Sequence, residues 1–323
     1  MAPETTPPVG RLAPSPPGRL HVGHARSFLL AWWHLRSRGG RVLLRIEDLD
    51  AQRCRPEFAD TALRDLEWLG LDWDGEPVWQ SRDVTAVAAA RDALLESGRA
   101  YACVCSRSEI REALSAPQSG LTETRYPGTC RGRFASPDEA LATGRTPGIR
   151  LQVERGPVSY EDAFAGSQRH DVAAEVGDFL IARRDGVFAY QLAVVVFDAH
   201  QGVTEVLRGQ DLLSSTARQL LLQDALGLPH PTWLHVPLVV DDEGERLAKR
   251  RGDLALASFR EAGVDPRALV AWVARSAGQT VPERVSAAEV LARFDLTSVP
   301  HGPVRFGSEE ASALSGARLR PPI

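Results

Sequence analysis

The sequence predicts an α/β fold, a doubly wound parallel sheet in which strands and helices alternate along the chain. Short apolar runs with β-branched residues alternate with amphipathic helical patterns through the first third of the sequence. Glycine and proline residues separate most of these segments, as expected for the turns between elements. The chain has 323 residues, of which 43% are hydrophobic and 25% are charged, so it can form a sizeable core.

The first elements are predicted in the order strand, helix, strand, helix, helix and strand. The run GRLAPSP starts extended and breaks at Pro14, and a helical pattern begins near Leu20 and closes at Gly39. RVLLRIEDLD predicts a buried parallel strand, and FADTALRDLEWLGL predicts an amphipathic helix that ends at Gly70. VTAVAAARDALLESGRA predicts a helix that stops at Gly98, and YACVC predicts the strand after it.

The rest of the chain is predicted to hold an insertion, the second half of the sheet and a short helical end. The pattern loosens over 103–177, where only GIRLQVE predicts a firm strand. DFLIARRDGVFAYQLAVVVFDAH predicts two apolar strands around an Asp185-Gly186 hairpin turn. A helix over 211–226 follows VTEVLRG, WLHVPLVV predicts a strand, and the last ~70 residues predict one or two helices.

The expected divisions are a disordered leader, the first half of the α/β domain, the insertion, the second half, and a helical C-terminal region with a tail (1–8, 9–102, 103–177, 178–255 and 256–323).

Net charge and cysteine content exclude several classes of protein. The 38 basic and 42 acidic residues give a net charge of −4, so RNA binding would need a local basic patch. No apolar run approaches the ~20 residues of a membrane span, and the proline-rich start has no signal-peptide core. Four cysteines are too few for a disulfide framework in a chain of this length. We therefore expect a cytoplasmic monomer with no membrane partner.

His21, Gly23 and His24 lie at the expected start of the first helix, after a strand and a proline-rich loop. Histidines at positions i and i+3 share one face of a helix. The amide groups and the positive dipole end favour phosphate there, and glycine lets a nucleotide approach the backbone. The two imidazoles can donate hydrogen bonds to phosphate oxygens, although a surface pair or half of a metal site would give the same motif.

Lys249 is the only lysine in the sequence, whereas all other basic residues are arginine. A single compact ammonium among so many planar guanidinium groups indicates a position where the shape of the charge matters. It lies in ERLAKRR, a cation-rich segment after a predicted strand and turn that can clamp a triphosphate. The alternative is an ordinary solvated run of charges.

HVGH and RLAKR resemble, in the right order, the His-Ile-Gly-His and Lys-Met-Ser-Lys-Ser signatures of class I aminoacyl-tRNA synthetases. RLAPSPPGRLHVGH, LLRIEDLD, EWLGLDWD and VFAYQLAVVVFDAHQGVTEVLRGQDLL are similar to the glutamyl-tRNA synthetase catalytic domain, and the likeness covers residues 9–255. This resemblance implies a class I synthetase Rossmann-like nucleotide-binding fold that uses ATP with Mg. It also implies catalytic roles for His21, His24 and Lys249, and ATP contacts by these residues and Gly23.

The second signature departs from the family pattern at three positions. Arg246, Ala248 and Arg250 replace the first Lys, the Ser and the last Ser. Lys249 alone occupies the catalytic lysine position. The resemblance therefore implies that Lys249 stabilises the charge of pyrophosphate.

A pocket for glutamate needs cations for two carboxylates and an anion for one ammonium. Arg11 and Arg208, each at the end of a predicted strand, can face the carboxylates, Glu47 can take the ammonium, and Tyr190 offers a hydroxyl on a predicted strand. The alternatives are a surface arginine pair, a structural Glu47–Arg45 neighbourhood and a core tyrosine. The family resemblance implies that these positions bind glutamate, together with the rest of the segment after Arg11: Leu12, Ala13, Pro14 and Ser15.

Three cysteines have a spacing that leaves a metal site and ordinary buried thiols both open. Cys103 and Cys105 follow a predicted strand, and Cys130 comes 25 residues later, with no fourth cysteine nearby. The segment YPGTC resembles the Tyr-x3-Cys motif of glutamyl-queuosine tRNA(Asp) synthetases. That resemblance implies one structural zinc held by these cysteines and Tyr126, in an inserted zinc-binding, acceptor-like subdomain.

The short C-terminal region bears on which tRNA the resemblance implies. Only 73 residues follow position 250, too few for the helical anticodon-reading region of full-length glutamyl-tRNA synthetases. The glutamyl-queuosine group lacks that region and attaches glutamate to the queuosine base of tRNA(Asp). We therefore expect activation of L-glutamate by ATP and transfer to queuosine-containing tRNA(Asp). The alternatives are a compact glutamyl-tRNA synthetase that charges a 3′ end, and a non-catalytic paralogue that binds glutamate or ATP.

Overall fold

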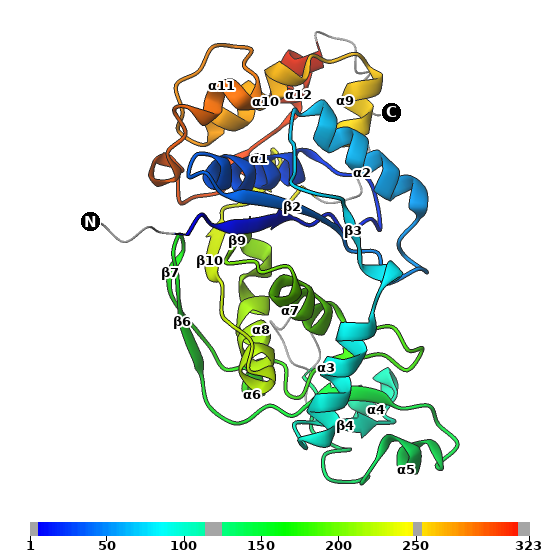
Figure 1. The fold of residues 1–323 in the computed structure, drawn as a ribbon. Helices are drawn as coiled ribbons and strands as arrows, with labels where there is room; N and C mark the ends of the chain where they lie inside the picture. Colours follow the sequence, from blue (N-terminus) through cyan, green and yellow to red (C-terminus); the bar gives the residue numbers. More distant parts are fainter. Residues whose placement is uncertain (1–5, 114–124, 248–253, 316–323) are drawn as a thin grey trace, which may run out of the picture.

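The computed structural model describes residues 6–113, 125–247 and 254–315, and shows parallel strands with helices on both sides (Figure 1). Several predicted features lie outside these ranges: most of the expected leader, the C-terminal tail, and Lys249 with its neighbours Ala248 and Arg250.

Five strands near the centre run parallel to their neighbours. They form the groups β1-β2-β3 and β9-β10: β1 (Val9–Leu12), β2 (Arg41–Ile46), β3 (Val78–Trp79), β9 (Glu205–Gly209) and β10 (Thr232–Val236). The amide of Thr204 donates to the carbonyl of Val9 at 2.8 Å, so β9 starts beside β1. The carboxyl ends of β1, β2 and β9 meet at one edge, where open α/β sheets bind their ligands.

Helices cover both sides of these strands, as expected for a doubly wound arrangement (Figure 1). α1 (Val22–Arg36) and α2 (Pro56–Trp68) lie on one side, and α7 (Tyr190–His200) and α8 (Leu213–Leu226) lie on the other. Trp33 of α1 belongs to one hydrophobic core, and Leu192 of α7 belongs to another. The α/β prediction is confirmed.

The region 103–177 contains more regular structure than its sequence predicted. An antiparallel sheet joins its borders: β4 (Ala100–Cys103), β5 (Gly148–Leu151) and β8 (Leu180–Ala182). A hairpin of β6 (Val158–Asp162) and β7 (Gly166–His170) was not predicted, because VSYED and GSQRH carry few apolar residues. The helices in and before this region are α3 (Thr85–Glu96), α4 (Arg107–Glu112), α5 (Pro137–Leu141) and α6 (Val172–Glu175).

Tyr190 lies on a helix, so the prediction of a second strand after the Asp185-Gly186 turn is wrong. Arg183 and Val187 close this turn with a 2.8 Å backbone hydrogen bond, and α7 begins at Tyr190. The run QLAVVVF has no clear period, because most of α7 is buried. Periodicity cannot separate a buried strand from a buried helix in so short an apolar run.

The C-terminal region holds more helices than the one or two expected. Its described elements are α9 (Leu256–Glu261), α10 (Pro266–Ser276), α11 (Ala287–Leu291), the 3-10 helix η4 (Leu296–Ser298), β12 (Val304–Arg305) and α12 (Ser308–Ser315). β12 pairs with β11 (Val239–Val240), and the indole of Trp33 donates to the carbonyl of Ala287 at 2.9 Å. This region therefore packs on α1 and shares its core, and short capped helices explain the underestimate.

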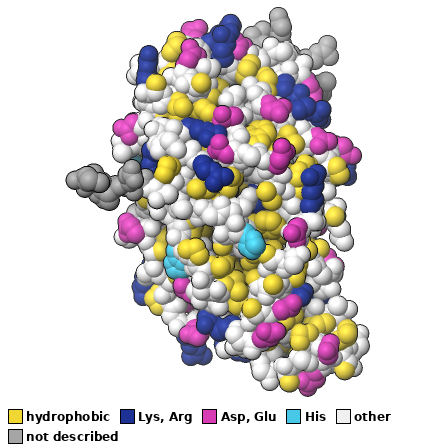
Figure 2. Space-filling model, in the orientation of Figure 1, with side chains coloured by type: hydrophobic (Ala, Val, Ile, Leu, Met, Phe, Trp, Pro, Cys, Tyr) yellow, Lys and Arg dark blue, Asp and Glu magenta, His cyan; other side chains and the backbone are white. Residues whose placement is uncertain are grey.

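Positive and negative side chains are interspersed on the face shown in Figure 2, in keeping with the small net charge. None of the helices in the described ranges combines the length and apolar character that a membrane crossing requires.

Candidate active site and metal centre

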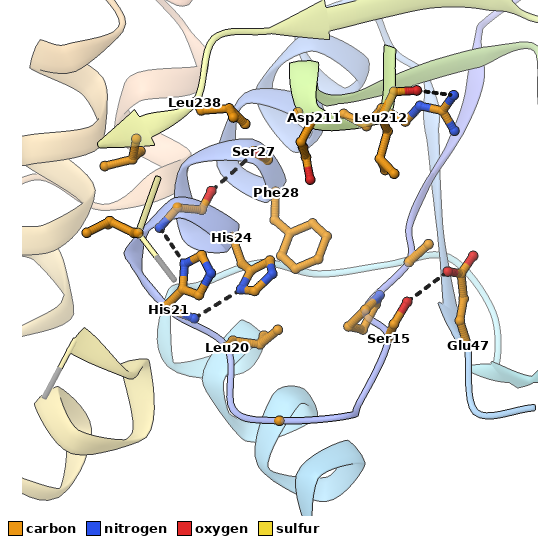
Figure 3. A pocket seen from close by; sticks show the side chains of 18 of the residues that line it. Ser15, Leu20, His21, His24, Ser27, Phe28, Glu47, Asp211, Leu212 and Leu238 are labelled. Atoms are coloured by element: carbon orange, nitrogen blue, oxygen red, sulfur yellow. Dashed lines mark hydrogen bonds between the residues drawn. The ribbon is translucent and has the colours of Figure 1, made fainter. Parts of the chain in front are cut away.

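A cavity of about 360 Å³ opens at the carboxyl edge of the parallel strands (Figure 3). Its lining includes most residues predicted for the nucleotide and glutamate sites: Arg11, Ala13, Pro14, Ser15, His21, Gly23, His24, Glu47, Tyr190 and Arg208. Leu12 differs, because its side chain is fully buried in the core, as alternation along β1 requires. The structure therefore brings together residues that are far apart in the sequence.

The two histidines at the start of α1 form a reciprocal cap. Nδ1 of His21 accepts from the amide of Gly23 at 3.1 Å, and Nδ1 of His24 accepts from the amide of His21 at 3.1 Å. Their ring centroids are 3.8 Å apart. Because both Nδ1 atoms accept, each neutral ring carries its proton on Nε2, and an Nε2–H group can donate to a phosphate oxygen. The cap thus sets the tautomer that phosphate binding needs.

Gly23 leaves the space that the His21 ring occupies. A Cβ atom built at this position would lie 3.0 Å from Cε1 and 3.1 Å from Nδ1 of His21. Such contacts are tighter than ordinary van der Waals packing, so a side chain would displace the ring. The sequence predicted Gly23 for nucleotide approach, and the structure adds this steric reason.

Arg208 is a buried cation whose partners are neutral. Its Nε donates to Nε2 of His235 at 2.9 Å. Its Nη2 donates to Thr216 at 2.9 Å and to Gln219 at 2.8 Å. Its Nη1 lies 3.5 Å from the hydroxyl of Tyr190. No carboxylate among the described residues forms a salt bridge with it, and burial lowers its pKa.

Arg11, in contrast, shares a carboxylate with Arg45 beneath the pocket. Asp198 accepts from Nε of Arg11 at 3.2 Å and from Nη1 of Arg45 at 2.7 Å. Nη2 of Arg45 donates to Glu47 at 3.2 Å, and the other carboxylate oxygen of Glu47 accepts from Ser15 at 3.0 Å. The structural contact between Glu47 and Arg45, one of the alternatives that the sequence left open, is therefore present. Glu47 still lines the cavity, so it can also face a ligand ammonium.

Tyr190, in the first turn of α7, lines the same cavity, and its hydroxyl lies beside Arg208. Burial raises the pKa of its phenol, although the nearby charge of Arg208 opposes this shift. The phenol therefore keeps its proton and can donate a hydrogen bond.

Two residues, one in the cavity lining and one beneath it, were not predicted from the sequence. Asp211 lines the cavity and forms a 2.6 Å ion pair with Arg246 of the second signature. Asp198, which neutralises Arg11 and Arg45, gave no motif because its partners lie far away in the sequence.

The described residues on either side of 248–253 lie close to the histidine pair. Leu247 lines the cavity, and its amide donates to the carbonyl of Val239 at 3.3 Å. On the other side, Ala255 forms a β-bridge with His21, and the amide of Leu256 donates to the carbonyl of Leu20 at 2.8 Å. Lys249 itself lies outside the described residues, so its role stays a prediction.

Cys103, Cys105 and Cys130 converge in the region 103–177, with their sulfur atoms within 4.8 Å of one another. The hydroxyl of Tyr126 lies 3.3 Å from Sγ of Cys103 and 3.7 Å from Sγ of Cys105. Three sulfur atoms and one phenol oxygen are a donor number that suits tetrahedral zinc. Cys54 takes no part, because its thiol contacts the backbone of Glu47 at 3.7 Å. The donor set therefore fits the metal that the resemblance implies.

Arg150 provides a buried positive charge beside these donors. Its Nε donates to Sγ of Cys103 at 3.3 Å, and its guanidinium lies 3.7 Å from the centre of the Tyr126 ring. The backbone amide of Cys130 donates to the Tyr126 oxygen at 2.9 Å. These contacts favour negative charge on the Cys103 sulfur and the Tyr126 oxygen, as ligand anions would require.

The fold and the cavity together define a class I synthetase: parallel strands, a histidine pair at a helix start, and the first residues of a second cationic motif, Arg246 and Leu247, in the same cavity lining. Comparison with known proteins agrees. Residues 9–310 match the class I tRNA synthetases (E and Q), catalytic domain, and the chain belongs to this family. It is a ligase of the aminoacyl-tRNA synthetase type.

Individual relatives refine this picture. The Glutamyl-Q tRNA(Asp) synthetase of Symbiobacterium thermophilum is 46% identical, and the match covers 95% of this chain and 98% of that protein. The Glutamate--tRNA ligase of Oleidesulfovibrio alaskensis is 38% identical over 97% of this chain and 66% of its own length. The glutamate-tRNA synthetase structure from Elizabethkingia anophelis has a TM-score of 0.81 and 26% identity, and covers 96% of this chain and 70% of that one. The resemblance to the glutamyl-queuosine group is confirmed.

Proposed function

We propose that the protein activates L-glutamate with ATP and transfers it to the queuosine base of tRNA(Asp). The observation that carries the glutamate assignment is Arg208, a buried cation with neutral partners in a cavity that also contains the histidine pair. An uncompensated buried charge is costly, and a ligand carboxylate relieves that cost. A second carboxylate must reach ATP, which makes a dicarboxylic amino acid the suitable substrate.

The cavity has two ends that suit the two halves of this reaction. His21 and His24 lie on one side in Figure 3, and Leu212, whose carbonyl accepts from Arg208, lies on the other. Arg208 and Tyr190 would hold the side-chain carboxylate, and Glu47 would hold the ammonium. Arg11 and the segment after it would line the path between them. The α-carboxylate is then directed towards the nucleotide.

Activation follows from this orientation. An oxygen of the α-carboxylate attacks the α-phosphorus of ATP, and the bond from that phosphorus to its bridging oxygen breaks. Pyrophosphate leaves with the bonding electron pair, and glutamyl-adenylate remains. The Nε2–H groups of His21 and His24 donate to phosphate oxygens as their charge grows, and Lys249 would neutralise the pyrophosphate. A nucleophile of the tRNA then attacks the carbonyl carbon and releases AMP.

The choice of acceptor rests on the relatives. The chain matches a Glutamyl-Q tRNA(Asp) synthetase along 98% of that protein, and a Glutamate--tRNA ligase along 66%. We further propose that 9–102 and 178–255 form the catalytic domain, which 103–177 interrupts. One structural zinc would bind Cys103, Cys105, Tyr126 and Cys130, where it would tie the start of this segment to residues about 25 positions further along it.

The decisive experiment uses RNase-treated protein, labelled glutamate and purified tRNAs. The proposal expects glutamate-dependent pyrophosphate exchange without any tRNA, and label on the anticodon loop of queuosine-containing tRNA(Asp). Exchange that requires tRNA(Glu), with label at the 3′ adenosine, would instead identify a compact glutamyl-tRNA synthetase. No exchange with either tRNA would identify a non-catalytic paralogue. Elemental analysis tests the metal separately, with about one zinc per chain expected and less in Cys130→Ser.

A further inference from the structure

A buried chain of three side chains ends at Arg208. Asp162 at the end of β6 contacts Nδ1 of His235 on β10 at 2.5 Å. Nε2 of the same imidazole accepts from Nε of Arg208 at 2.9 Å. All three side chains are almost fully excluded from solvent. Neither Asp162 nor His235 lines the cavity, so they can reach a ligand only through Arg208.

The geometry allows only one protonation pattern along this chain. Nε of Arg208 always carries a proton, so Nε2 of His235 must offer its lone pair. The proton of the neutral ring then resides on Nδ1 and is donated to Asp162. Burial, with the charge of Arg208, lowers the pKa of His235 to about 4, although Asp162 opposes this shift. The ring is therefore neutral at physiological pH.

Asp162 is itself fixed as an anion. Its Oδ1 accepts from the backbone amides of Phe164 at 3.0 Å, Ala165 at 2.7 Å and His235 at 3.1 Å. Burial alone would raise its pKa, but the hydrogen bond from His235 and those from the amides lower it. The turn of the β6–β7 hairpin thus holds the carboxylate that orients the imidazole.

These contacts fix the orientation of the Arg208 guanidinium and leave one of its nitrogen atoms, Nη1, with a weaker partner. His235 takes Nε, while Thr216 and Gln219 of α8 take Nη2. Within the described residues, the remaining nitrogen, Nη1, has a single hydrogen-bond partner, the Tyr190 hydroxyl at 3.5 Å. Both Arg208 and Tyr190 line the cavity, so Nη1 is the guanidinium nitrogen that a ligand carboxylate there could pair with.

We propose that Asp162 and His235 are positioning residues for glutamate recognition: Asp162 selects the imidazole tautomer, and His235 fixes the orientation of Arg208 towards the substrate carboxylate. The proposal rests on the proposed function, because it assumes that Arg208 binds glutamate. It adds a specificity determinant outside the cavity, on the β6–β7 hairpin and on β10, neither of which carries a synthetase signature.

Asp162→Asn is the sharpest test because it keeps the size of the side chain. The Asn oxygen can still accept from the backbone amides, while its NH₂ group donates to Nδ1 of His235. The ring must then place its proton on Nε2, opposite the Nε–H of Arg208, and two donors face each other. We expect KM for glutamate to rise about 10-fold or more, while KM for ATP stays within about twofold.

Two variants of His235 should differ in how strongly they raise KM for glutamate. His235→Gln retains an acceptor for Arg208 and should recover part of the affinity for glutamate. His235→Phe retains the ring shape without an acceptor and should give the largest rise in KM. His230→Phe is the matched control, because His230 is a partly exposed histidine that pairs with Asp224 away from the cavity.

Nitrogen-15 NMR of the imidazoles gives a readout that does not depend on activity. The wild type should show His235 protonated on Nδ1, and Asp162→Asn should show it protonated on Nε2. A folded Asp162→Asn protein with unchanged KM for glutamate, or with unchanged tautomer, overturns the proposal. A wild-type protein with the expected tautomer but no glutamate-dependent exchange would instead refute the proposed function.

Discussion

Arg45 and Arg208 are both buried arginines close to the same cavity, but their charges are balanced differently. Arg45 has no exposed surface, and its guanidinium contacts Asp198 at 2.7 Å and Glu47 at 3.2 Å. Burial would lower its pKa, but these two carboxylates raise it. Arg208 has 5% exposed surface, its hydrogen-bond partners among the described residues are all uncharged, and burial lowers its pKa.

This difference separates a structural cation from one that is available to a ligand. The protein supplies both counter-ions of Arg45, so nothing remains there for a substrate to neutralise. At Arg208 the protein supplies hydrogen bonds without negative charge. These bonds hold the side chain in place but do not neutralise its charge. Burial alone would have grouped the two residues together, whereas the charge of their partners distinguishes them.

Arg208→Gln should have the largest effect on activity. Glutamine retains hydrogen-bonding capacity but removes the charge, so a glutamate carboxylate would enter the site without a cation. We expect kcat/KM for glutamate in pyrophosphate exchange to fall about 10³-fold, and the preference for glutamate over glutamine to shrink.

Arg305→Gln is the control for this experiment, because Arg305 pairs with Asp242 at a partly exposed site outside the cavity. An Arg208→Gln protein within about tenfold of the wild type would show that the open charge at Arg208 is not the main determinant of glutamate binding.

Arg45→Met should mainly lower stability, whereas Arg208→Gln should mainly lower activity. Removing the guanidinium leaves Asp198 and Glu47 buried with less positive charge around them. We expect the free energy of unfolding in urea to fall by about 3 kcal/mol. Adding Asp198→Asn should recover part of this loss, because one of the two carboxylates becomes neutral. A single variant that loses less than about 1 kcal/mol would contradict the structural role of Arg45.

The contrast between the two arginines also shows how far the sequence could lead. Local patterns predicted the strands that end near Arg11 and Arg208, the histidine pair and the cysteine group, because short-range spacing carries these features. The partners that decide their chemistry are far apart in the sequence. Asp162 reaches His235 from a hairpin without an apolar pattern, and Asp198 lies on a helix that the sequence predicted as a strand. Such pairings are set by tertiary packing.

Gly23→Ala tests whether the nucleotide end of the cavity is independent of the glutamate end. The new methyl group would meet the ring of His21 at 3.0 Å and shift it. We expect kcat in pyrophosphate exchange to fall about tenfold, with KM for glutamate nearly unchanged. Stability should change little, because the higher helix propensity of alanine offsets the weakened His21 cap. Gly302→Ala is the matched control, since no atom lies within 4 Å of its added Cβ. A selective change in KM for glutamate would show that the two ends are coupled.

Glu205→Gln should give the smallest effect. It tests a third ionic group, which has a charged partner, as Arg45 does, but one that is partly exposed. Glu205 lies on β9, three residues before Arg208, and contacts His34 at 2.8 Å and Arg38 at 2.6 Å. Burial alone would raise its pKa, but His34 and Arg38 lower it to about 2 from the ordinary 4.5. A lowered pKa means that the folded state favours the ionised form. The stabilisation is therefore complete above pH 4.5 and is lost as the pH falls towards about 2.

Because Arg38 is partly exposed, we expect Glu205→Gln to lower the free energy of unfolding by only about 1 kcal/mol at pH 7. Urea unfolding of wild type and variant should show a gap at pH 7 that narrows steadily below pH 4.5, and a gap of constant size would mean that the charge of Glu205 does not contribute.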